Sequence, residues 1–107
     1  MANNRWTEKA QNALRLSYEA ASALGHNYVG SEHILLGLLG EKRGVASKIL
    51  LSYGVTGDAL TAAIVQAIGK GMPGVQPMGM TPHAKEIMEL AAAEAAGQGA
   101  GCIGTEH

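Results

Sequence analysis

The sequence predicts an all-α fold built as a single domain. Glycine and proline divide the chain into segments whose apolar residues recur at three- and four-residue steps, and almost no segment alternates apolar and polar residues as a half-buried strand does. Apolar residues make up 47% of the chain while phenylalanine is absent, a composition suited to closely packed helices. With 107 residues, the chain is long enough for one hydrophobic core and too short for two separate ones.

The first two predicted helices lie before Gly40. Thr7 caps the first helix, which ends near Gly25, a residue type that readily adopts the left-handed conformation found after helix C-termini. Ser31 caps the second helix, and Glu32 in its first turn complements the positive end of the helix dipole. The second helix is short and very apolar, and it stops at Gly40.

Two further short helices follow. The third ends at Gly54, and the fourth runs from its cap Thr56 to Gly69. Their predicted inward-facing residues are Val45, Ala46, Ile49 and Leu50 in the third helix and Leu60, Ala63, Ile64 and Ala67 in the fourth.

The next segment, 69–80, holds four glycines and two prolines, which predicts a flexible linker. Thr81 then caps a fifth helix with Pro82 at its first position, where a missing amide proton costs nothing. The fifth helix ends at Gly97.

An internal repeat organises these elements. An offset of 74 residues aligns 7–33 with 81–107 without a gap. We therefore expect a first repeat at 1–68, the linker at 69–80 and a second repeat at 81–107, packed as a pseudo-twofold bundle of two four-helix repeats. The identical pairs are Thr7/Thr81, Ala10/Ala84, Leu16/Leu90, Ala21/Ala95, Gly25/Gly99, Gly30/Gly104, Glu32/Glu106 and His33/His107.

The second repeat is incomplete, because it stops at His107, where the counterpart of the apolar helix 34–39 should begin. We expect a truncated chain that exposes apolar surface. Such a chain is predicted to be marginally stable, or to cover the exposed surface by dimerising or by swapping an element with another chain.

The repeated acids are the best candidates for ligand binding. Glu32 and Glu106 each stand just inside a predicted helix start, where a carboxylate beside free backbone amides can hold a ligand that carries both charges. Thr7 and Thr81 open helices in the same register, and each offers a hydroxyl and backbone amides to an anion such as phosphate. The alternative for all four residues is ordinary helix capping and dipole complementation.

Other classes of function receive little support. The histidines lack metal-ligand spacing, so we expect no metal and no cofactor, and no nucleophile–base pair for a small hydrolase can be named. The net charge of −1, without a basic stripe, disfavours nucleic acid and anionic membranes, and no apolar run is long enough to cross a bilayer. Residues 1–6 lack the pattern of a secretory signal, and the single Cys102 suits a reducing, cytoplasmic setting.

Three stretches resemble a known family: RWTEKAQNAL at 5–14, GHNYVGSEHILLGLL at 25–39 and GTEH at 104–107. They are similar to the Clp N-terminal domain, and most similar to its ClpC branch among the AAA+ unfoldases. The long glycine–histidine run is far more specific than any short catalytic motif, and its second copy matches the duplication of that family.

The resemblance implies a binding domain without enzymatic activity of its own, tethered to a hexameric ATPase that feeds the ClpP peptidase. Such a domain receives adaptor proteins and substrates, and in the ClpC branch it recognises phosphoarginine, one mark per repeat. Carried over by motif, Glu32 with Thr7 would form one phosphoarginine pocket and Glu106 with Thr81 the other.

Two alternatives remain open at this stage. The second copy departs from the pattern, since 26–28 (HNY) becomes 100–102 (AGC) and basic residues late in the fifth helix are replaced by 96–98 (AGQ). These changes leave the second pocket less secure. The rival function is a Clp-type module that docks only adaptor proteins, with both glutamates serving as first-turn charges.

Overall fold

The computed structural model describes residues 5–72 and 74–107, so part of the signal-free N-terminus and Pro73 of the predicted linker lie outside the described residues. The described residues form helices joined by turns, with two isolated β-bridges and no named strand. The all-α prediction is confirmed. The helices are α1 (Glu8–Ala23), α2 (Ser31–Gly40), α3 (Val45–Ser52), α4 (Gly57–Ile68) and α5 (Pro82–Gly97).

Three threonines cap helices as predicted. The hydroxyl oxygens of Thr7, Thr56 and Thr81 accept the backbone N–H of the residue three positions later, at 3.1, 3.2 and 3.0 Å. Each cap satisfies one of the amides that the first helical turn leaves without a backbone partner. Gly25 follows α1 with φ +75°, and Gly99 follows α5 with φ +72°, so both copies of the long helix end in the same left-handed turn.

The predicted cap at Ser31 is wrong. Ser31 is the first residue of α2, and Gly30 is the N-cap. A glycine has no side chain to cap the helix, and the imidazole of His33 satisfies the turn instead: its Nδ1 accepts the Gly30 N–H at 2.9 Å. The sequence rule failed here because a side chain inside the helix reaches back to the residue before it.

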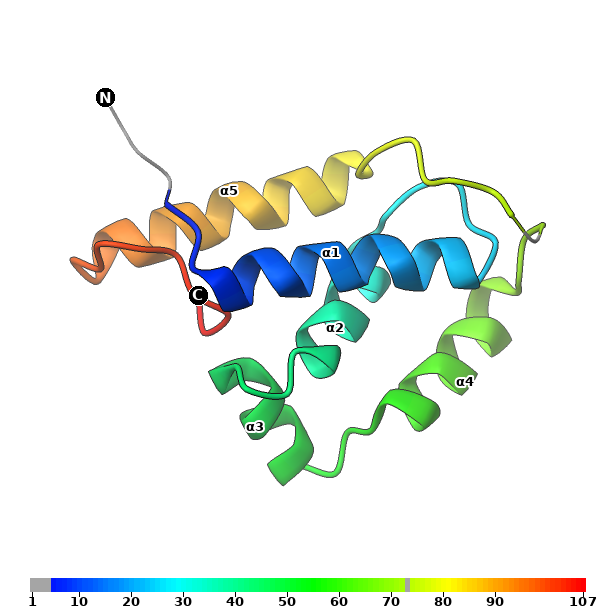
Figure 1. The fold of residues 1–107 in the computed structure, drawn as a ribbon, viewed down its shortest axis with the longest axis horizontal. Helices are drawn as coiled ribbons and strands as arrows, with labels where there is room; N and C mark the ends of the chain where they lie inside the picture. The colour runs from blue at the N-terminus through cyan, green and yellow to red at the C-terminus, as the bar shows by residue number, and fades with distance from the viewer. Residues whose placement is uncertain (1–4, 73) are drawn as a thin grey trace.

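Two reciprocal backbone bridges relate the repeats. The N–H of Thr7 donates to the carbonyl of Ile103, and the N–H of Thr81 donates to the carbonyl of Val29, both at 2.9 Å. The offset of 74 exchanges these two bonds, so the pseudo-twofold relation of the sequence is also present in the backbone. Because the start of each long helix lies beside the chain that follows the other, α1 and α5 run in opposite directions (Figure 1).

The centre of the fold is α2, which contacts each of the other four helices. Its Ile34 joins Ala21 of α1, Val29 and Ala84 of α5 in the buried core. This core lies between the two long helices and sets the positions of the turns at 24–30 and 98–107.

The predicted inward-facing residues of α3 and α4 are only partly correct. Val45 and Ile49 are 46% and 50% exposed, and the buried residue of α3 is Ser47. In α4, Ile64 is buried but Ala63 and Ala67 are exposed. Among the described helices, α3 and α4 pack only on α2, and a helix with one neighbour buries a narrower stripe than its apolar pattern suggests.

The segment 69–80 is irregular, as its glycines and prolines predict, but it is hydrogen-bonded to the first repeat rather than free of it. Gly71 donates to the carbonyl of Leu24, and Met78 donates to the carbonyl of Asn27, both at 2.8 Å. At Gly71 the backbone passes so close to the carbonyl of Gly25 that a Cβ would overlap it. A glycine is therefore required at position 71 by packing.

Candidate ligand-binding site

An open hollow lies beside the start of α2, and the start of α5 forms part of its wall. Glu32 and Lys70 supply its carboxylate and its ammonium group, and Thr81 supplies a hydroxyl. The backbone bridge between Val29 and Thr81 holds the two helix starts together. The lining residues are Gly25, His26, Asn27, Tyr28, Gly30, Glu32, His33, Ile68, Lys70, Gly71 and Thr81.

The carboxylates of Glu32 and Glu106 adopt the same orientation. Each folds back over the glycine two positions earlier: a Cβ on Gly30 would lie 2.7 Å from Oε1 of Glu32, and one on Gly104 would contact Oε1 of Glu106. Within residues 5–72 and 74–107, neither carboxylate takes part in an ion pair. Both acids are therefore available to a cationic ligand.

The structure pairs the predicted site residues differently from the sequence-based assignment. Glu32 shares its hollow with Thr81, not with Thr7. Thr7 lies beside Ile103, in the bridge that leads to Glu106. The pairing within each repeat is wrong because the repeats exchange helix starts: each long helix begins against the acidic turn of the other repeat.

A pair of imidazoles forms the floor of the Glu32 hollow. Nε2 of His33 lies 2.8 Å from Nδ1 of His26, and Nε2 of His26 lies 2.8 Å from the carbonyl oxygen of Gly69. His33 is 2% exposed. Burial lowers the pKa of His33 below its usual 6.5, the Glu32 carboxylate opposes this shift, and the nearby His26 adds to it.

Sequence reasoning missed His26 and Lys70 as members of the site. It treated the histidines as surface or core residues and read Gly69-Lys70 only against a phosphate-loop pattern. A signal was present in the repeat, since His33 recurs as His107 whereas His26 aligns with Ala100. That difference marks the first copy as the one with an additional polar contact.

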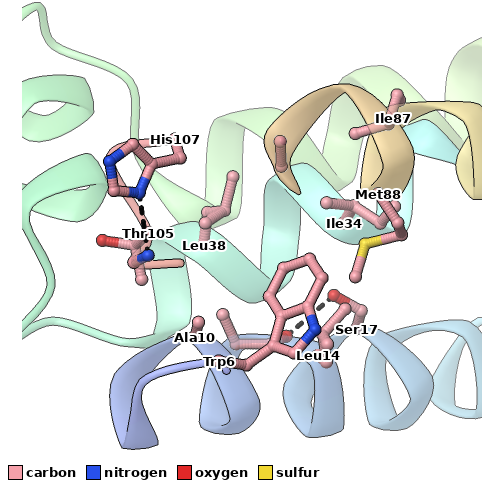
Figure 2. A pocket seen from close by; sticks show the side chains of 13 residues that line it. Trp6, Ala10, Leu14, Ser17, Ile34, Leu38, Ile87, Met88, Thr105 and His107 are labelled. Carbon is pink, nitrogen blue, oxygen red and sulfur yellow. Dashed lines mark hydrogen bonds between the residues drawn. The ribbon is translucent and has the colours of Figure 1, made fainter. Parts of the chain in front are cut away.

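At the other end of the molecule, Thr7 and the segment 104–107 border an apolar cavity of ≈ 130 Å³. Figure 2 shows the Trp6 indole beside Leu14 and Ser17 of α1, with Ile87 and Met88 of α5 across the cavity. His107 repeats the turn seen at His33, because its Nδ1 accepts the Gly104 N–H at 2.9 Å. The cavity lining is almost entirely apolar, unlike that of the Glu32 hollow.

The part of the chain with described coordinates contains no group of three or more His, Cys, Asp or Glu side chains that could hold a metal ion. No single described helix is long and apolar enough to cross a membrane; α3 and α4 together pass the length and composition test but meet at a bend of 83°.

The fold and the two acidic turns define a small helical domain built from a duplicated unit. Residues 5–107 match the family model described as the Clp repeat (R) N-terminal domain, and the chain belongs to this family. The expectation from its sequence motifs is confirmed.

Known relatives agree with this assignment. The chain is 44% identical over its whole length to the chaperone protein ClpB of Oceanobacillus iheyensis and 42% identical to ClpC/MecB, a negative regulator of genetic competence in Bacillus subtilis. It spans 13% of the length of each of these proteins. Among solved structures, the N-terminal domain of the chaperone ClpD from Arabidopsis thaliana matches with a TM-score of 0.80 and 25% identity, over all of this chain and 74% of that one.

Proposed function

We propose that this domain is the substrate- and adaptor-docking module of a ClpC-type protein unfoldase and that the Glu32 hollow binds phosphoarginine on marked proteins. The observation that supports it best is the meeting of an acid outside any described ion pair with the start of another helix in one open hollow. Phosphoarginine carries a guanidinium and a phosphate, so its receptor needs an acceptor and donors a few ångströms apart.

In this hollow Glu32 accepts hydrogen bonds from the guanidinium N–H groups. The phosphate is placed at the start of α5, where the helix dipole and unpaired amides favour an anion. Pro82 has no N–H and the Ala84 N–H donates to Thr81, so the His83 amide and the Lys70 ammonium are the donors left for phosphate.

The second proposed pocket joins Glu106 with Thr7, and we expect it to bind the same ligand less tightly. Glu8 stands in the first turn of α1 and repels a phosphate there, whereas α5 has no acid in its first turn. The first pocket is therefore the stronger of the two in this proposal.

In the wider proposal, the domain passes adaptors and arginine-phosphorylated proteins to an ATPase ring that delivers them to the ClpP peptidase, in the cytoplasm. The exposed thiol of Cys102 is compatible with such a reducing compartment.

Adaptor docking without phosphoarginine binding is the second candidate, and the exposed apolar side chains support it. Tyr53 is 81% exposed at the end of α3, and Met72 and Met78 are 73% and 76% exposed on the segment 69–80. Methionines on a surface suit variable apolar partners, including a second copy of this chain.

Calorimetric titration with free phosphoarginine tests the proposal. We expect saturable binding that Glu32→Gln weakens about 10- to 100-fold, because a charge-assisted hydrogen bond contributes roughly 1.5–3 kcal/mol. Glu106→Gln should remove only the weaker binding event. Glu89→Gln is the matched control, since Glu89 is an exposed acid of α5 outside the hollow.

Absence of binding by a folded sample would reject phosphoarginine recognition and leave adaptor docking. Free arginine and phosphoserine, each with one of the two charged groups, serve as comparison ligands. Equal affinity for all three would also count against a receptor for the double charge.

A further inference from the structure

A continuous hydrogen-bonded chain crosses the floor of the Glu32 hollow. It runs from the Gly30 N–H to Nδ1 of His33 at 2.9 Å, from Nε2 of His33 to Nδ1 of His26 at 2.8 Å, and from Nε2 of His26 to the Gly69 carbonyl at 2.8 Å. The chain begins at the cap of α2 and ends on the segment that follows α4.

The two ends of this chain determine where its protons lie. A backbone N–H can only donate, so Nδ1 of His33 is unprotonated and its Nε2 carries the hydrogen. That Nε2–H donates to Nδ1 of His26, which therefore carries its own hydrogen on Nε2 and donates it to the Gly69 carbonyl. Both rings are neutral in this arrangement, and all four ring nitrogens are used.

An additional proton has no place in the chain. On His33 it would sit at Nδ1, facing the Gly30 N–H, and on His26 it would sit at Nδ1, facing the N–H of His33. Either event turns a hydrogen bond into a contact between two donors, which cannot persist in a buried site.

We propose that His26 and His33 form a proton-sensitive latch that holds the segment 69–71 against the start of α2 and keeps the Glu32 hollow in its described shape while both imidazoles are neutral. Protonation releases Gly69, and with it Lys70 and Gly71, which line the hollow. The inference concerns the shape of the hollow and does not depend on which ligand occupies it.

The charged and titratable neighbours of the latch come from three elements. Glu32 on α2 favours protonation of the imidazoles, Lys70 on the following segment disfavours it, and Tyr28 lies in the turn between α1 and α2. From α4 and α5 the hollow receives Ile68 and Thr81, which carry no charge. Burial outweighs the Glu32 carboxylate and lowers the pKa of His33, so the neutral pair is favoured near pH 7.

Nuclear magnetic resonance of the ¹⁵N-labelled domain tests the latch. At pH 7.5 the ring ¹⁵N shifts of His26 and His33 should both report the Nε2–H form. As the pH falls toward 5, the Gly30 and Gly71 amide signals should shift together with the His33 ring. In His26→Ala, the Gly71 amide should lose this response.

His83→Ala is the matched control, because His83 is a well-exposed histidine on α5, and the response should survive in that variant. Finding His33 in the Nδ1–H form would overturn the proposal. So would a Gly71 signal that stays still while the rings titrate, and this comparison needs only the unmodified protein if His26→Ala does not fold.

Discussion

The turns that carry Glu32 and Glu106 have the same local structure and different surroundings. In both, a glycine amide donates to the histidine three residues later at 2.9 Å, and the acid folds over that glycine. Around Glu32 a second histidine and a lysine complete a polar hollow. Around Glu106 the His26 position is Ala100, and the neighbouring cavity is apolar. A short motif thus determines the shape of a turn, while the elements packed against it determine its chemistry.

The largest expected effect concerns the tie that is present only on the Glu32 side. Gly71→Ala places a methyl group onto the Gly25 carbonyl, so the free energy of unfolding should fall by about 2–3 kcal/mol. Gly101→Ala, on the Glu106 side, meets no atom within 4 Å and should change stability by less than about 0.5 kcal/mol. Urea denaturation measures both, and equal losses would show that the segment 69–80 contributes no such tie.

A smaller difference should separate the equivalent leucines of the long helices. Leu16 is half-buried and lies against Gly40 of α2, whereas Leu90 is 62% exposed. Leu16→Ala should therefore cost about 1–2 kcal/mol and Leu90→Ala less than about 0.5 kcal/mol in the same denaturation experiment. A large cost at Leu90 would indicate that its α5 face is covered in solution, for example by a second copy of the chain.

The two threonine caps test where the halves are alike. Thr7→Ala and Thr81→Ala each remove one hydrogen bond to a helix amide, and each should cost about 1 kcal/mol. Serine at either position should restore most of the loss, because its hydroxyl accepts the same N–H. Unequal costs, compared by thermal unfolding, would mean that one hydroxyl has a further role.

The pH dependence should be the subtlest difference, and its direction follows from His33. Its pKa is lowered in the folded protein from 6.5, so the unfolded chain binds more protons as the pH falls through 6.5. The free energy of unfolding should therefore decrease from about pH 7 toward the lower pKa of the folded state. His33→Asn keeps an acceptor for the Gly30 N–H and removes the ionisable ring, so it should flatten this slope. An unchanged slope would assign it to another group.

A second acid-sensitive group lies outside the hollow. Glu41 accepts hydrogen bonds from the Asn12 side chain at 3.0 Å and from the Arg43 backbone at 3.2 Å. The Asn12 hydrogen bond is the main cause that lowers the pKa of Glu41 below its usual 4.5. The stability that it contributes is present above pH 4.5 and is lost as the pH falls through the lowered pKa, a range separate from that of His33.

Much of this architecture could be predicted from local chemistry. Thr7, Thr56 and Thr81 cap helices as their positions predict, and glycines end α1 and α4 as expected. These features depend on residues within one helical turn of each other, so the linear sequence contains the information. The duplicated acidic turns were also visible, because a fixed offset of 74 residues exposes them.

Other features depended on contacts between distant segments. The sequence is the same whether Thr81 meets the acid of its own repeat or Glu32 of the other, and only the backbone bridge at Val29 decides between them. Burial of α3 was overestimated at Val45 and Ile49 for a related reason, since an apolar stripe does not tell how many neighbours a helix has.

The amino-acid sequence by itself determined the helices, their caps, the duplication and the membership of the Clp repeat family, because each is encoded in residues that are close in the chain or repeat at a constant spacing. The tertiary structure alone decided that the repeats exchange helix starts, that His26 reaches Gly69, and that Lys70 joins Glu32 in one hollow. Packing brings these groups together across up to about fifty residues of chain, and no local propensity specifies contacts over that separation.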